Sequence, residues 1–578
     1  MYMGKKFLIN LLCFVLSYIA VFTFSLFYLP TLLDKMHLVY TPPKIIYPQY
    51  SVYVPNQLEM YIQPQLDALK QISFMQTPKF LINPETETSA TSATPLTVGV
   101  HCKVCLTFLN TPEQKKQQVF KKTHQFLTLQ NFVFLPVSHL YSTKTRIHEF
   151  NTRKFYALSK DQAILKALNL PDIQIEYVQN VAQLAKTLRN HPNILGFVQV
   201  QDLTPALKVV STKNQTFLDT RNPNDAMLVS IDLIVPKEHY KDVYNIMQAR
   251  RLIASYHKPH ITTLIYTGVT AISRNLALAI ERAGSPIYPT TPELTQFLRS
   301  ATYTHTSNEV SFVPGCKPTQ SMRFCSAPEY FQLLKHVGID IIELTGNHNN
   351  DYSAKWNAWT IQNIYKPNNI KYFGGGVNIN DAKKPTILTS EHIKIGLLGY
   401  NYYDTIYNHT NALATKTHAG ANPFYWKQIQ QDIQNLRKKV DIIVVSVQFQ
   451  ECYSYPPADV IYPVCYKPLR WPDQKKTFRK IVDLGADIVV GTQAHQPQTF
   501  EMYKNSLIFY GLGNLFFDQI YWIGTRQALA LKFYFYQNKL INVKIVPLQQ
   551  SKDFKQHIAT PEQGKLLLQL LDQARNSL

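Results

Sequence analysis

The stretch GIDIIELTGNHNNDYS, residues 338–353, joins an apolar run to a polar one. GIDIIELT is the kind of short apolar segment that forms a buried strand. Asn and Asp compete with helix and strand for backbone hydrogen bonds, so the second half indicates a loop. A polar cluster thus follows the carboxyl end of a strand, where open α/β sheets place their sites. Three interpretations follow: a metal site, a binding site or a polar turn.

The same order of helix, glycine and apolar strand recurs through the second half of the chain. Predicted helices at 275–284 and 328–338 close at Gly284 and Gly338, because glycine adopts the left-handed conformation that ends many helices. The alternation predicts a layered α/β fold. The segments that carry a predicted strand and the turn, loop or polar cluster after it are 261–270, 338–345, 370–378, 393–401, 440–451, 486–498 and 505–519.

The N-terminus carries an uncharged run, FLINLLCFVLSYIAVFTFSLFYL, of 23 residues at 7–29. At 1.5 Å per residue this length spans a hydrocarbon core of about 30 Å. Lys5 and Lys6 precede it, which places the N-terminus in the cytoplasm and the rest of the chain outside. A cleaved signal peptide is the alternative, although its apolar region is normally shorter.

The rest of the chain is expected to form a linker region and two α/β domains. Residues 181–211 loosely resemble part of a periplasmic-binding-protein-like lobe. The expected organisation is a cytoplasmic tip at 1–6, a transmembrane anchor at 7–29, a Pro/Tyr-rich and Ser/Thr-rich linker at 30–96, a smaller α/β domain at 97–255, the main α/β domain at 256–550 and a C-terminal helix at 551–578.

The net charge indicates which kinds of partner the protein binds, and the cysteines indicate the redox compartment in which it lies. A formal net charge of +21 favours anionic surroundings such as lipid headgroups, anionic polymer or nucleic acid. Lys and Arg are scattered without a basic arm, so nucleic acid is not a predicted partner. Six cysteines outside the span permit disulfides in an oxidising compartment, with free buried thiols as the alternative. They form the local pairs Cys102 with Cys105, Cys316 with Cys325 and Cys452 with Cys465.

Polar clusters follow several predicted strands, in TSNEVSF, TGNHNNDYS, VQFQE, GTQAHQPQ and GLGNLFFDQ. GIDIIELTGNHNNDYS, GADIVVGTQAHQPQ and FYGLGNLFFDQ together resemble the CapA family of capsule-synthesis proteins, also called PgsA-like, across about residues 261–525. The resemblance implies a metallophosphoesterase-like α/β sandwich of two sheets flanked by helices. It also implies a membrane-anchored envelope protein that makes or exports capsule or poly-γ-glutamate-type anionic polymer. The implied partners are that polymer or the membrane proteins that synthesise it.

The family's motifs match this sequence only in part. Gly268 and Arg274 match its Gly-Asp turn, but Val269 stands where a metal-binding Asp is expected. Gln448 and Gln493 stand where two His residues are expected. Val cannot ligate a metal and Gln offers only a neutral oxygen, so the sequence predicts at most one divalent ion, Mn, Zn or Fe.

The resemblance assigns roles to the residues that remain. Two alternatives to the polymer role stay open: a phosphoesterase with a reduced metal site, and a non-catalytic envelope scaffold. The candidate catalytic residues are His348, His495 and Asp351; the candidate substrate contacts are Arg274, Asn308, Gln448, Gln493 and Asn514; the candidate metal ligands are Glu309, Asn347, His348, Glu451 and His495.

Overall fold

A computed structural model describes residues 49–54, 56–72, 79–84, 96–102, 124–168, 173–211, 216–222, 226–255, 257–450, 467–576 and 578. The chain forms two compact units, Met1–Val98 with Leu233–Leu252 and Gly99–Asp232 with Ile253–Leu578. The expected membrane span at 7–29 lies outside the described residues. None of the helices within the described ranges combines the length and apolar character needed to cross a membrane.

The first unit contains regular structure where the sequence indicated a linker. Leu58, Ile62 and Leu66 are spaced four residues apart, and all three are buried. Leu58 directly precedes the helix α3, which is kinked at Ile62, close to Pro64, so the proline obscures the helical pattern in the sequence. The unit contains β1 (Gln49–Val54), α3 (Glu59–Ile72), β2 (Lys79–Pro84), the start of β3 (Leu96–Cys102) and α8 (Tyr240–Ala249). β1 pairs in parallel with both β2 and β3.

The N-terminal part of the second unit is mixed α/β. β4 pairs antiparallel with β7 and β8, and β5 pairs in parallel with β6 and β7. Its elements are β4 (His124–His139), β5 (Asn151–Leu158), α5 (Gln162–Ala167), β6 (Gln174–Val178), α6 (Val181–Asn190), β7 (Ile194–Gln199), β8 (Leu207–Val209), α7 (Phe217–Thr220) and most of β9 (Met227–Pro236).

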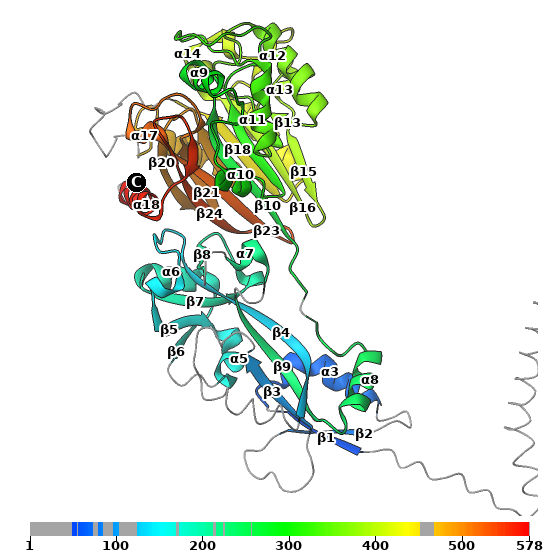
Figure 1. Ribbon diagram of the computed structural model, residues 1–578. Helices are drawn as coiled ribbons and strands as arrows, with labels where there is room; N and C mark the ends of the chain where they lie inside the picture. Colours follow the sequence, from blue (N-terminus) through cyan, green and yellow to red (C-terminus); the bar gives the residue numbers. More distant parts are fainter. Residues whose placement is uncertain are drawn as a thin grey trace, which may run out of the picture. The chain divides into compact units, whose positions relative to one another are not determined.

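The rest of this unit is built on two sheets (Figure 1). The first has the order β13-β12-β11-β10-β23-β24-β25, with β22 beside β10, and β10 to β13 run parallel. Its strands are β10 (Ile261–Thr270), β11 (Tyr303–Asn308), β12 (Ile341–Glu343), β13 (Lys371–Phe373), β22 (Asn514–Phe516), β23 (Gln527–Tyr536), β24 (Lys539–Gln550) and β25 (Gln556–Ile558).

The second sheet has the order β15-β16-β18-β19-β21-β20. β16, β18, β19 and β21 run parallel, and β15 and β20 are antiparallel edges. Its strands are β15 (Thr386–Ser390), β16 (Ile393–Asn401), β18 (Ile442–Gln448), β19 (Ile488–Thr492), β20 (Pro497–Tyr503) and β21 (Ser506–Leu512).

Apolar side chains of the two sheets pack against each other in one core, which includes Leu264 and Phe533 from the first sheet and Leu397 and Val444 from the second. A second core covers the outer face of the first sheet with α9 (Arg274–Ala283), α10 (Pro292–Leu298) and α11 (Phe331–His336). A third covers the second sheet with α15 (Trp426–Arg437) and α16 (Gln474–Asp483). The region is therefore a sandwich of two sheets flanked by helices, as predicted.

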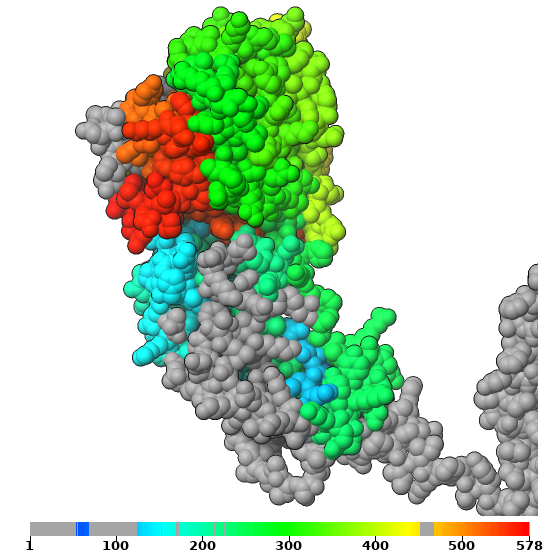
Figure 2. All heavy atoms as spheres, in the orientation of Figure 1, coloured from blue at the N-terminus to red at the C-terminus, as the bar shows by residue number. Residues whose placement is uncertain are grey.

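The chain ends in the predicted helix, α18 (Pro561–Arg575), which begins at a capping box of Thr560 and Gln563. Just before it, the backbone N–H of Gln556 donates to the Pro289 carbonyl at 2.7 Å. The C-terminal segment thus lies beside the segment that leads into α10, seen as red against green in Figure 2.

An ion cluster joins α7 to the strands of the first sheet. Asp219 accepts hydrogen bonds from Lys532 at 2.9 Å, Lys544 at 2.9 Å and the Tyr534 hydroxyl at 2.7 Å. Burial alone would raise the pKa of Asp219, but the two lysines and the hydroxyl lower it overall. Lys532 is only 5% exposed, so its charge depends on this carboxylate.

Candidate functional site

The carboxyl ends of strands from both sheets meet at one edge of the sandwich. Gln448, at the end of β18, contacts the side chain of Asn347, which follows β12. His495 follows β19 and contacts Asn514 at the start of β22. The sequence placed these polar clusters at strand ends, and the structure brings them together from two facing sheets.

The loop of GNHNND is held by its own asparagines. Asn350 donates to the Ala419 carbonyl at 2.9 Å, and the Asn349 carbonyl accepts from the Ser311 hydroxyl at 2.5 Å. A Cβ at Gly346 would stand 2.8 Å from Cα of Glu309, so only glycine lets the loop pass this close to β11. These contacts fix the position of His348.

His348 is held by a carboxylate. Its Nδ1 lies 2.7 Å from Oδ2 of Asp351, and its ring packs on Phe324 with centroids 4.1 Å apart. Burial alone would lower the pKa of His348. The hydrogen bond to Asp351 and the charges of Glu309 and Asp351 outweigh burial and the opposing effect of His495, so the pKa is raised. With Nδ1 bonded to Asp351, Nε2 is the nitrogen left to act on a ligand.

His495 is held by an amide. Asn514 Nδ2 donates to the carbonyls of His495 and Thr525, at 3.0 and 3.1 Å. Asn514 Oδ1 therefore faces His495 Nδ1, at 2.9 Å, and accepts a hydrogen bond from its N–H. In the neutral ring this leaves Nε2 as the basic nitrogen. The two histidines thus have different electrostatic environments, one carboxylate-bound and one amide-bound.

Glu309 follows β11 directly and is 2% exposed. Its backbone N–H donates to the Thr270 carbonyl at 2.9 Å, which ties it to the end of β10. Its charge acts on His348 and favours the protonated ring. Glu309 and His495 therefore both lie within electrostatic reach of His348.

Three amides form a cluster beside the histidines. The Gln448 amide contacts both Asn347, at 2.9 Å, and Gln493. With this amide turned over, its nitrogen donates to the Thr345 carbonyl at 2.9 Å and its oxygen accepts from the Asn347 N–H at 3.0 Å. This orientation pairs both ends of the Gln448 amide within the protein. The two glutamines that replace expected histidines thus contact each other directly.

Arg274, a predicted substrate contact, is paired inside the protein. Its Nε and Nη2 donate to Asp518 at 2.9 and 2.6 Å, and the Asp518 side chain is fully buried. Its guanidinium also lies over the rings of Phe324 and Phe517, at 5.0 and 5.6 Å. The arginine clamps the start of α9 to the segment after β22.

Asn308 also points into the protein. Its Nδ2 donates to the Tyr365 hydroxyl at 2.8 Å and to the Val310 carbonyl at 2.7 Å. Asp351 holds the loop as well as His348, because Oδ2 accepts from the Phe324 N–H at 2.7 Å. Glu451, a predicted metal ligand, lies outside the described residues.

Sequence reasoning missed a second buried carboxylate near His348. Asp404 accepts from Asn401 Nδ2 at 2.6 Å. Burial raises the pKa of Asp404, and Asn401, His409 and His348 oppose the rise. The signal was present in GYNYYD, where polar residues again follow a strand.

A polar network beneath the site was also not predicted from the sequence. Glu343 and His305 are both fully buried, with Nε2 of His305 3.4 Å from Oε2 of Glu343. Thr492 donates to Glu343 at 3.0 Å, and Tyr266 stacks on His305 with centroids 3.5 Å apart. Burial lowers the pKa of His305 despite the opposing charge and hydrogen bond of Glu343.

The described donors do not fit a two-metal centre. Such a centre needs several carboxylates and imidazoles, whereas Glu309, His348 and His495 give one carboxylate and two imidazoles. Val269 is apolar, and the two glutamines contact each other. Within the described residues, the ligand atoms of Glu309, His348 and His495 do not all lie within 4.8 Å of one another.

This part of the chain is a layered α/β fold of two packed sheets flanked by helices. Histidines, amides and a carboxylate form a polar site where the strand ends of the two sheets meet. Residues 263–519 match the family described as "Bacterial capsule synthesis protein PGA_cap". This region is similar to CapA/PgsA-like capsule-synthesis proteins, and every described candidate residue lies inside it.

Two curated relatives are similar to the same part of the chain. "Capsule biosynthesis protein CapA" of Bacillus anthracis is 29% identical over 236 residues, which is 40% of this chain and 53% of the relative. "PGA biosynthesis protein CapA" of Bacillus subtilis (strain 168) is 27% identical over 234 residues, which is 40% of this chain and 55% of the relative. The chain thus spans about half the length of these relatives.

Among solved structures, an ABC-type phosphate transport receptor from Vibrio cholerae is 8% identical to this chain. The match covers 35% of this chain and 96% of the receptor. Its TM-score of 0.21 is too low to support an argument about fold or ligand.

Proposed function

We propose that this protein acts in the synthesis or export of an anionic capsule polymer of the poly-γ-glutamate type. The observation that carries the proposal is the family match over 263–519, which encloses the whole described site. The net charge of +21 suits a polyanionic partner. The raised pKa of His348 supports it further, because a protonated imidazole favours a carboxylate ligand.

The proposed setting is the outer side of a bacterial membrane, with residues 7–29 as the anchor and polymer-synthesis membrane proteins as partners. The disulfide between Cys316 and Cys325 supports an oxidising compartment. In this setting the polymer contacts Nε2 of His348 and His495. Arg274 stays paired with Asp518 and supports the site from within the protein.

Polymer binding tests the proposal. The full chain in detergent micelles is passed over immobilised poly-γ-glutamate and over dextran, a neutral polymer. Binding to poly-γ-glutamate is expected to be stronger and to weaken by at least about tenfold in the double variant H348Q/H495Q, since charge-assisted contacts are lost. H336Q, at an exposed histidine at the end of α11 that precedes the amino end of β12, is the matched control and should bind as wild type. Equal binding to both polymers would overturn the proposal.

A second candidate is acid–base hydrolysis of a phosphoester. It is favoured by the different environments of the two histidines, since such a difference separates an acid from a base. In that reaction His348 Nε2 donates a proton to the leaving oxygen and His495 Nε2 accepts one from water. Hydrolysis of p-nitrophenyl phosphate that is unchanged in H348Q and in H495Q would eliminate this candidate.

A further inference from the structure

A group of metal-ligating side chains lies on the surface, apart from the strand-end site. It consists of His260, just before β10, with Glu391 and His392 in the turn between β15 and β16. Their ligand atoms all lie within 4.8 Å of one another, and within the described part of the chain no other group of three does so. The side chains are 72%, 72% and 55% exposed, so an ion can reach them from solvent.

The distances within this group suit one ion. His260 Nδ1 is 3.3 Å and His392 Nε2 is 3.7 Å from Oε2 of Glu391. Two ligands placed about 2.0–2.1 Å from a tetrahedral Zn²⁺ are about 3.3 Å apart. The first pair already has this separation, and the second needs only a small side-chain rotation.

Hydrogen bonds from side-chain hydroxyl groups hold the chain in place beside these ligands. The Thr262 hydroxyl donates to the Ser390 hydroxyl at 2.8 Å, and the Tyr303 hydroxyl donates to the Thr389 carbonyl at 2.8 Å. Ser390 pairs with Ile393 in the β15–β16 ladder, which fixes the turn that carries Glu391 and His392. An ion would therefore bind to segments that are already in place, at a low cost in chain entropy.

We propose that His260, Glu391 and His392 form a surface site for a divalent transition-metal ion, with Zn²⁺ as the best match. Two imidazoles and one carboxylate, with a water in the fourth position, are a regular zinc ligand set. Cu²⁺ and Ni²⁺ share a preference for imidazole, whereas Mg²⁺ and Ca²⁺ prefer oxygen ligands and should bind weakly here. This site does not depend on the proposed polymer function.

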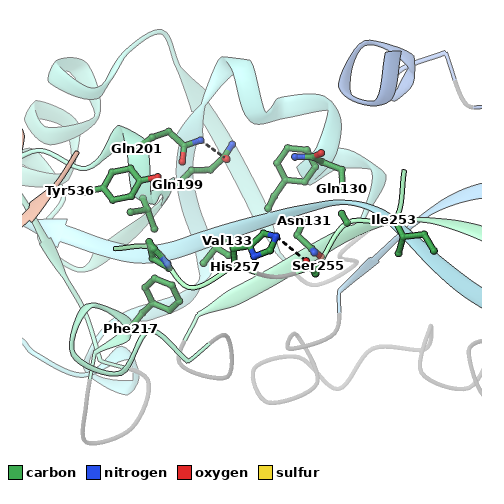
Figure 3. Close-up of a pocket in the computed structure, with 14 residues that line it drawn as sticks. Gln130, Asn131, Val133, Gln199, Gln201, Phe217, Ile253, Ser255, His257 and Tyr536 are labelled. Carbon is green, nitrogen blue, oxygen red and sulfur yellow. Dashed lines mark hydrogen bonds between the residues drawn. The ribbon is translucent and has the colours of Figure 1, made fainter. Parts of the chain in front are cut away.

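The chain segment that leads to the proposed metal site also lines a cavity. The segment that ends at His260 supplies Ile253, Ser255, His257 and Pro259 to the wall of a cavity of about 550 Å³ (Figure 3). β4 supplies another wall, with Gln130, Asn131 and Val133, and the Ser255 hydroxyl lies 2.9 Å from Nε2 of His257. An ion bound to His260 would tether the end of this wall to the sandwich.

Zinc titration of the full chain, stripped with chelator and exchanged into chelator-free buffer, tests the site. Isothermal titration calorimetry is carried out in the background H348Q/H495Q, so that the strand-end histidines do not contribute. We expect one bound Zn²⁺, with affinity reduced by at least about tenfold in H260Q, E391Q and H392Q. H239Q is the matched control, because His239 lies 3.7 Å from Glu238 without a second histidine.

A second readout separates binding from misfolding. All three ligands are exposed, so the variants should keep the wild-type melting temperature in chelator, and only proteins with the intact site should be stabilised by added Zn²⁺. Zinc binding of equal affinity in H260Q and the parent would overturn the proposal, as would an absence of zinc binding by the folded parent.

Discussion

Replacing Asp351 by Asn removes the charge that holds His348 while keeping the shape of the side chain. Oδ2 of Asp351 lies 2.7 Å from Nδ1 of His348, with side chains 17% and 14% exposed. Hydrogen bonds to charged groups contribute roughly 1.5–3 kcal/mol, and neutral ones about 0.5–1.5 kcal/mol. The substitution should therefore lower the free energy of unfolding by about 1–1.5 kcal/mol while His348 is protonated.

The loss should depend on pH, because the native environment raises the pKa of His348. A group of this kind stabilises the fold fully below the pKa of histidine in the unfolded chain, about 6.5. Its contribution disappears as pH rises through the folded-state pKa. Urea unfolding should show the full loss in D351N near about pH 5.5 and a smaller loss near about pH 8.5.

Two controls make this result specific. An NMR titration of His348 should give a lower pKa in D351N than in wild type. D473A removes the N-cap side chain of α16, where Asp473 accepts from the Lys476 N–H at 2.8 Å, and should cost about 1 kcal/mol equally at both pH values. An equal loss at both pH values in D351N, or an unchanged pKa of His348, would refute the reasoning.

Three further substitutions follow from the described contacts. D219A leaves the buried Lys532 without its carboxylate and should lower the free energy of unfolding by about 3–5 kcal/mol, measured by urea denaturation. G346A forces a Cβ to within 2.8 Å of Cα of Glu309, and should reduce both thermal stability and polymer binding, checked by calorimetry and biolayer interferometry. C316S/C325S opens a loop with a sequence separation of 9 and should cost about 2–3 kcal/mol, a difference that should vanish when wild type is reduced.

The strands and helices of the sandwich could be predicted because their signals are local. Gly284 ends α9 at φ 60°, as the sequence indicated for a helix closed by glycine. The apolar run before the GNHNND loop forms β12, buried on every residue. The pairing of strands into two sheets instead depends on contacts between residues far apart in sequence, which no local pattern specifies.

The direction of polar side chains at the site could not be predicted for the same reason. Asn308 and Arg274 stand at the right strand ends, but each finds a distant partner, Tyr365 and Asp518, that directs it into the protein. Asn514 was predicted as a substrate contact, and in the structure it orients His495. A buried polar group needs a hydrogen-bond partner, and the sequence alone does not show which partner the fold supplies.

The amount of capsule polymer at the cell surface tests the central claim most directly. The source organism would carry H348Q/H495Q in the gene for this protein, with H336Q as the matched control. Extracted surface polymer is quantified as glutamate after acid hydrolysis, with the level of the protein followed by immunoblot. The account predicts a several-fold loss of polymer in the double variant at an unchanged protein level. Wild-type amounts of polymer in the double variant would contradict it.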